Sequence, residues 1–121
     1  MDLAAGKYLL LTTFRKDGTP VPTPVWVAGG NGTLYAWSVA DAGKVKRIRR
    51  SGDVRIGPCD LRGKPTGEQV PATARLLDQA GSDHVRSLIA KKYGVVGKVT
   101  LFGSRLRRGR EGTIGIEIKP A

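Results

Sequence analysis

A run of cations stands out in the middle of the chain. From Lys44 to Arg50, five of seven residues are basic, within Gly-Lys-Val-Lys-Arg-Ile-Arg-Arg. Helical spacing would place Val45 and Ile48 on one apolar face, and Lys44 and Arg47 together on an adjoining face. Like charges this close repel one another, so an anion bound against them would stabilise the segment. The pattern is typical of either a phosphate-binding site or a solvated basic helix face, and the residues alone do not distinguish the two.

The residues before this helix also suit an anion. Ser38 and Asp41 are of types that cap helix N-termini, and Gly43 would let a ligand approach the backbone closely. Free N–H groups and the helix dipole make such a terminus a natural phosphate site. We therefore expect the N-terminus of the basic helix to be its binding end.

A second unusual pattern is a strand with three alternating prolines. Pro20, Pro22 and Pro24 lie in a predicted strand over residues 19–28, separated by β-branched residues. Alternate N–H groups of a strand point to the same edge, so the prolines remove the donors from one edge and leave the other able to pair. The blocked edge keeps its carbonyls. It either binds a ligand or prevents unwanted strand pairing, and we weigh these two roles equally.

The elements that would position these residues are mostly strands. Ser82 or Asp83 can cap a helix that ends at Gly94, with Val85, Leu88, Ile89 and Tyr93 on its apolar face. Residues 95–103 are not assigned. Period-two or apolar runs predict strands over 7–14, 19–28, 33–38, 54–59, 70–76 and about 114–118. We expect one domain over residues 1–121, a mainly β closed or split barrel of about six antiparallel strands with two short helices.

Composition limits the possible functions. The formal charge of +11, from 21 basic and 10 acidic residues, indicates a polyanionic partner: nucleic acid, anionic lipid or a phosphate-bearing cofactor. Cys59 is the only cysteine and His84 the only histidine, so we expect no disulfide and no metal site. No catalytic carboxylate pair can be singled out. No apolar run approaches the roughly 20 residues of a membrane span, and the start is unlike a signal peptide, so we expect a cytoplasmic protein without a membrane partner.

Five segments together resemble a known family. In order along the chain, these segments are Lys7-Tyr8-Leu9-Leu10-Leu11-Thr12-Thr13-Phe14-Arg15-Lys16-Asp17-Gly18, Pro22-Thr23-Pro24-Val25-Trp26, Gly43-Lys44-Val45-Lys46-Arg47-Ile48-Arg49-Arg50, Pro58-Cys59-Asp60 and Lys92-Tyr93-Gly94. The pattern covers nearly the whole chain. It resembles the pyridoxamine 5'-phosphate oxidase-like flavin and deazaflavin oxidoreductases, and within them the small actinobacterial branch that uses coenzyme F420.

The resemblance implies an FMN-binding-type split barrel that forms a homodimer, with the cofactor at the subunit interface. It implies that Lys44, Lys46 and Arg47 hold the cofactor phosphate, with Ser38 beside them. The deazaflavin ring would lie along Pro24-Val25-Trp26. Reduced F420 would supply a hydride to an unsaturated small-molecule substrate, so no catalytic side chain is expected.

Two departures from the family pattern bear on the cofactor. Ser51-Gly52-Asp53 stands where Asp-Pro-Arg is more usual, and Arg47 where some relatives have asparagine. These differences leave FMN open as an alternative cofactor.

Two other functions remain possible on sequence grounds. The first is a non-catalytic protein of the same fold that binds flavin, deazaflavin or haem. The second, less favoured, is a nucleic-acid-binding barrel, in which the basic helix and the arginines of residues 105–110 contact phosphates while Trp26, Trp37 or Tyr35 stack on bases. A low aromatic content of 6% counts against the second.

Overall fold

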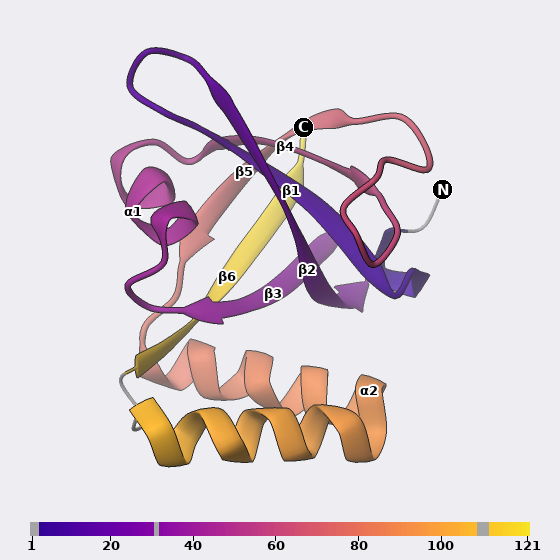
Figure 1. Ribbon diagram of the computed structural model, residues 1–121, viewed down its shortest axis with the longest axis vertical. Helices are drawn as coiled ribbons and strands as arrows, with labels where there is room; N and C mark the ends of the chain where they lie inside the picture. The colour runs from indigo at the N-terminus through magenta and orange to yellow at the C-terminus, as the bar shows by residue number, and fades with distance from the viewer. Residues whose placement is uncertain (1–2, 31, 109–111) are drawn as a thin grey trace.

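Six strands form a closed antiparallel barrel, with one helix at its end and another along its side (Figure 1). The structure is a computed structural model that describes residues 3–30, 32–108 and 112–121. The strands follow the order β1-β2-β3-β6-β5-β4 around the barrel, which confirms the expected fold class. They are β1 (Tyr8–Phe14), β2 (Pro20–Gly30), β3 (Thr33–Val39), β4 (Asp53–Pro58), β5 (Val70–Leu76) and β6 (Thr113–Pro120).

Alternate apolar side chains of the strands fill the barrel interior. Because successive strand residues point to opposite faces, every second residue of each strand can face inward. Ile48 from α1 (Gly43–Arg50) joins this core, so α1 closes one end of the barrel. The buried core residues are Leu9, Leu11, Val25, Val27, Leu34, Ala36, Ile48, Val54, Ile56, Ala72, Ala74, Ile116 and Ile118.

α2 (Gln79–Arg108) consists of two helical segments that meet at Gly94, and the first of them packs on the outer face of β2, β3 and β6, as Figure 1 shows. Within the described residues, no helix is both long and apolar enough to cross a bilayer. The apolar face predicted for α2 is confirmed, and it forms a second core with the outward side chains of β2 and β3. This core consists of Ala28, Val85 and Ile89, with Trp26, Tyr35, Trp37, Leu77, Leu88 and Tyr93 packed against it.

The packing under α2 bears on the nucleic-acid hypothesis. Trp26, Tyr35 and Trp37 are half-buried and pack against the core beneath α2, as expected for packing residues and not for an exposed row of base-stacking rings. The side chains of the arginines at 105–110 lie outside the described residues.

α2 bends at Gly94, which has φ 63° and ψ −136°. The sequence predicts that the helix ends there. That prediction is confirmed: Gly94 ends the first helical segment, and a second helical segment follows that takes in residues 95–103, which the sequence left unassigned. Glycine adopts a positive φ without a steric penalty, so the chain can turn sharply here. No proline lies between Gly94 and Arg108 to stop a new helix.

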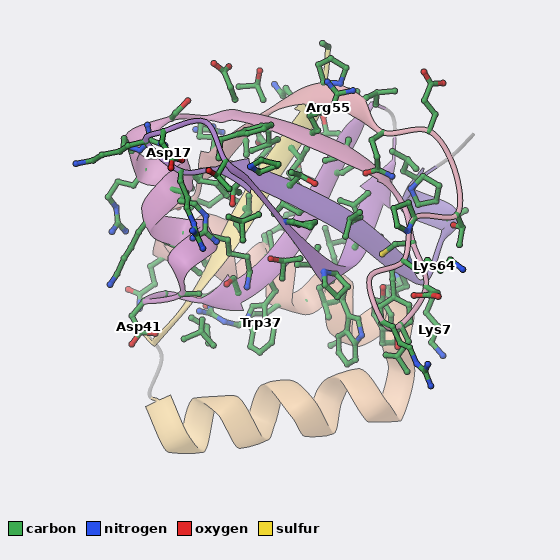
Figure 2. All side chains as sticks on the ribbon, turned by 45° about the horizontal axis from the view of Figure 1, so that its top comes forward. Lys7, Asp17, Trp37, Asp41, Arg55 and Lys64 are labelled. Carbon is green, nitrogen blue, oxygen red and sulfur yellow. The ribbon has the colours of Figure 1, made fainter. Side chains whose placement is uncertain are left out.

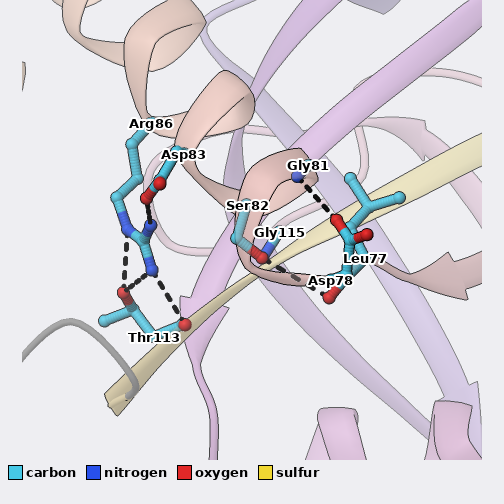
Figure 3. Close-up of polar contacts among 8 residues, drawn as sticks. All are labelled: Leu77, Asp78, Gly81, Ser82, Asp83, Arg86, Thr113 and Gly115. Carbon is cyan, nitrogen blue, oxygen red and sulfur yellow. Dashed lines mark hydrogen bonds and ion pairs between the residues drawn. The ribbon is translucent and has the colours of Figure 1, made fainter.

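The predicted start of α2 is wrong. Asp78, rather than Ser82 or Asp83, caps the helix: its Oδ1 accepts from the Gly81 N–H at 2.8 Å and its carbonyl oxygen accepts from the Ser82 N–H at 2.8 Å. Ser82 is buried, and its Oγ accepts from the Gly115 N–H in β6 at 2.9 Å (Figure 3). The side chain proposed as a cap therefore joins the helix to the barrel.

A second polar contact joins α2 to β6. Arg86 pairs with Asp83 and donates from Nη2 to the carbonyl oxygen of Thr113 at 2.9 Å and to its Oγ1 at 2.7 Å (Figure 3). This guanidinium is therefore committed to holding the helix against the strand.

Candidate cofactor site

α1 begins without a side-chain cap. Its N-cap residue is Ala42, and no side chain accepts a hydrogen bond from its first turn. The caps predicted from sequence are therefore wrong. Ser38 lies buried in β3, where its hydroxyl donates to the Val39 carbonyl oxygen at 3.1 Å, and Asp41 is exposed. Val45 already donates to the Ala42 carbonyl oxygen at 3.1 Å, so the N–H groups of Gly43 and Lys44 are those left for water or for an anion.

Arg47 folds back over this terminus. Its Nε donates to Oγ1 of Thr13 in β1 at 2.7 Å, and Thr13 is only 1% exposed. A Cβ placed on Gly43 would lie 2.8 Å from Nη1 of Arg47, so the guanidinium rests directly against the glycine backbone. A larger side chain at this position would have to displace the Arg47 guanidinium. The result is a cation fixed beside free helix N–H groups.

Lys44 lies next to Arg47 and is half-buried. Burial, and then the positive charge of Arg47, lower the pKa of the Lys44 ammonium from its ordinary value. Among the described residues, no carboxylate forms an ion pair with Lys44. The basic residues that do form ion pairs in this part of the chain are Arg75, Arg86 and Lys119. Two neighbouring cations without a counter-charge are unfavourable, and a bound anion would relieve both the desolvation and the repulsion.

The remaining basic residues of α1 point elsewhere. Lys46 is exposed and, two positions from Lys44, faces a different side of the helix. Arg50 donates from Nη2 to the Phe14 carbonyl oxygen at 2.6 Å, which holds the end of α1 against β1. The structure thus brings together Lys44 and Arg47 and leaves Lys46 apart from them.

As the sequence predicts, β2 pairs with β1 through the edge that keeps its N–H groups, and the proline edge faces away from β1. Pro20, Pro22 and Pro24 stand opposite Phe14, Thr12 and Leu10 of β1. Proline has no N–H, so the intervening residues make the ladder hydrogen bonds to β1, and the prolines face the other way.

β2 pairs with β3 only over Val27–Gly30, and the two strands diverge beyond it (Figure 1). The proline part of β2 is therefore not in a ladder on that side. Arg47 of α1 contacts Thr13 of β1, which stands opposite Val21 in this part of β2. The carbonyls of the proline edge thus run from α1 toward Trp26.

The three residues predicted to lie along the ring differ in what they can offer. Val25 is 7% exposed and points into the barrel core, so only its backbone could contact a ligand. Pro24 is exposed, and the backbone of Gly63 lies close to its ring. Trp26 is half-buried and stacks on Tyr93 of α2, with ring centroids 4.4 Å apart and an interplanar angle of 10°.

Sequence reasoning treated α2 as packing and missed the role of its residues Lys92 and Tyr93. The Tyr93 hydroxyl donates to the Lys7 carbonyl oxygen at 2.6 Å and accepts from the Val27 N–H at 3.1 Å. Lys92 Nζ donates to the carbonyl oxygens of Gly6 and Val27, each at 2.6 Å. These contacts fix Tyr93 against Trp26. In the sequence, the only sign that Lys92 and Tyr93 matter is that Lys92-Tyr93-Gly94 is one of the segments that resemble the family.

Similarity to solved structures establishes the fold. No protein-family model and no curated protein sequence matches this chain. The haem-storage protein HutZ from Vibrio cholerae is 15% identical, with a TM-score of 0.69 over 97% of this chain and 83% of that one. A structure described as an F420 reductase is 17% identical, with a TM-score of 0.63 over 98% and 90%. A Listeria innocua protein provisionally assigned as a pyridoxamine 5'-phosphate oxidase is 17% identical, with a TM-score of 0.64 over 94% and 83%.

The chain has the split-barrel fold of the pyridoxamine 5'-phosphate oxidase-like proteins. Structures of this fold include proteins named for F420 reduction and for haem storage, so the fold alone leaves the cofactor open. The choice depends on the residues of the site. Among the described residues, no group of three or more His, Cys, Asp and Glu side chains could hold a metal ion.

Proposed function

We propose that this protein is an oxidoreductase that uses coenzyme F420 to transfer a hydride to or from an unsaturated small molecule. The observation that carries the proposal is the half-buried Lys44–Arg47 pair, which has no carboxylate partner in the described part of the chain. This pair lies at the uncapped N-terminus of α1, where Arg47 contacts Thr13 of β1, and Thr13 stands opposite Val21 in the proline part of β2.

The site fits a phosphorylated cofactor with a planar ring. A phosphate would accept from the first N–H groups of α1 and from the ammonium and guanidinium of Lys44 and Arg47. The ring would lie along β2. There Pro24 has no N–H and offers only its carbonyl oxygen as an acceptor, and Trp26 offers an aromatic surface. Reduced F420, when bound, supplies the hydride, and the chain's own residues position the ring and substrate and exclude water. A second subunit would supply the far wall of this groove, so the proposal includes a homodimer.

FMN is the alternative cofactor, because its phosphate would suit the same cations. Haem fits less well. The only histidine, His84, lies on α2 with its ring edge-on to Tyr35, 5.9 Å between ring centroids, and lines another cavity with Asp78 and Glu117. Neither Lys44 nor Arg47 lines that cavity, so a haem held by His84 would not use the cation pair.

Binding of oxidised F420 and of FMN, measured by calorimetry, tests the proposal. We expect F420 to bind more tightly than FMN. Lys44→Ala should weaken F420 binding by about 1–3 kcal/mol, the value of a charge-assisted hydrogen bond to phosphate. The variant should remain folded, because it removes an uncompensated buried charge.

Arg49→Ala is the matched control. It removes the same charge from the same helix, but Arg49 is exposed. We expect its effect on affinity to be below about threefold. Equal losses in the two variants would show that only general positive charge matters. Absence of saturable F420 binding to the wild-type protein would overturn the proposal, and FMN bound without turnover would favour a flavin carrier.

A further inference from the structure

A cavity of about 380 Å³ opens beside the start of β1, at the other end of the strand from α1. Arg50 of α1 contacts β1 at Phe14, six residues from Tyr8, which corresponds to about 20 Å along a strand. Figure 2 agrees: Lys7 and Asp41, which precedes α1, lie at opposite sides of the barrel. The cavity is lined by Ala5, Gly6, Lys7, Tyr8, Trp26, Lys92 and Tyr93.

One wall of the cavity is a rigid aromatic surface. Trp26 and Tyr93 are stacked nearly parallel, and the Tyr93 hydroxyl is hydrogen-bonded to the backbone of Lys7, just before β1, and of Val27 in β2. Lys92 fixes the same corner through the carbonyls of Gly6 and Val27. A ligand ring would therefore meet side chains that are already ordered, so little conformational entropy is lost on binding.

The polar groups of the cavity are cationic or hydroxyl. Its two charged lining residues are Lys7 and Lys92, and none of the described residues that line it is acidic. The Lys7 ammonium is exposed and makes no ion pair with a described carboxylate. The Tyr8 phenol adds a possible hydrogen-bond donor. An anionic oxygen would be attracted here, and a cationic ligand would be repelled.

We propose that this cavity binds a planar conjugated ring that carries an anionic oxygen, as a carboxylate or a phenolate. The ring packs against Trp26 and Tyr93, and the oxygen points to Lys7 with Tyr8 as a donor. That this cavity is the substrate site of the enzyme rests on the proposed function, since Trp26 is also the last residue of the Pro24-Val25-Trp26 segment along which the cofactor ring would lie. It assigns the substrate to the class of aromatic or conjugated oxyanions.

The coenzyme-free protein and the probe 2-naphthoate test this directly. The chain has two tryptophans, so an ¹⁵N-labelled sample gives two indole N–H signals, which Trp37→Phe assigns. We expect 2-naphthoate to shift the Trp26 signal saturably and to leave the Trp37 signal in place. The neutral isostere 2-naphthamide and the non-planar cyclohexanecarboxylate should each bind more weakly.

A pair of lysine variants tests the role of charge. Lys7→Gln should weaken 2-naphthoate binding by roughly two- to fivefold, the range for an exposed ion pair. Lys16→Gln, an equal charge change at the exposed β1–β2 turn, should not alter it. Equal effects of the two variants, equal binding of the amide, or an unmoved Trp26 signal would overturn the inference.

The two proposals can fail separately, because no coenzyme is present in this titration. Binding of 2-naphthoate by a protein that does not bind F420 would support the cavity and reject the proposed function. Binding of F420 without binding of 2-naphthoate would reject the cavity alone.

Discussion

Lys44 is the residue in which burial and charge conflict most clearly. Its ammonium is half-buried beside a second cation, and both effects lower its pKa. A protein that never bound an anion there would gain stability by replacing the lysine with a neutral side chain. The unfavourable charge is understandable if a ligand supplies the missing anion, since the same pair that destabilises the free protein then stabilises the complex.

The pH dependence of stability should report this conflict. Because the pKa of Lys44 is lower in the folded than in the unfolded chain, the unfolded chain binds more protons between the two values. The free energy of unfolding therefore rises with pH in that window, which lies below the ordinary lysine pKa of about 10.4. Denaturant unfolding from about pH 7 to pH 10 should show that the free energy of unfolding of the wild-type protein rises relative to that of Lys44→Met as pH rises.

The comparison with Lys44→Met removes contributions that the two proteins share, such as the raised pKa of Tyr93. Saturating phosphate should raise the pKa of Lys44 and shrink the gain. A stability difference that does not change with pH would contradict this account of Lys44.

At the scale of elements, the contact between α2 and β6 should matter for stability. Ser82 is 2% exposed and accepts from the Gly115 N–H, which is also buried. Ser82→Ala leaves that donor unpaired, so we expect a loss of about 1–3 kcal/mol in the free energy of unfolding. Ser87→Ala, at an exposed position of the same helix, should change it by less than about 0.5 kcal/mol. Equal stability of the two variants by denaturant titration would show that the bond contributes little.

How well an element could be predicted depended on how local its signal is. The strand at Val70–Leu76 was predicted to its ends, because its alternation is uninterrupted. The start of α2 was misplaced because Asp78, Ser82 and Asp83 are all cap types, and tertiary contacts decide which one caps. The pairing of Lys44 and Arg47, by contrast, has a local signal, because their i,i+3 spacing in a helix predicts that they share a face. The contacts of Tyr93 with Val27 and Lys7 join residues 66 and 86 positions apart, and no local pattern indicates them.

At the scale of the whole molecule, the dominant property is the formal charge of +11. Such an excess attracts anions over long range and raises association rates without fixing how a ligand is held. The Lys44–Arg47 pair acts at short range and is partly shielded from solvent. Long-range attraction should therefore govern the association rate, and the pair should govern dissociation.

Stopped-flow binding of F420 can separate the two contributions. Raising the salt concentration from about 20 mM to about 300 mM should lower the association rate constant by about tenfold, because screening removes the long-range attraction. Lys44→Ala should mainly raise the dissociation rate constant, since it removes a contact made only in the complex. Arg49→Ala should lower the association rate constant slightly and leave dissociation unchanged. If Lys44→Ala acted only on association, Lys44 would be one surface charge among many and the phosphate would have to bind elsewhere.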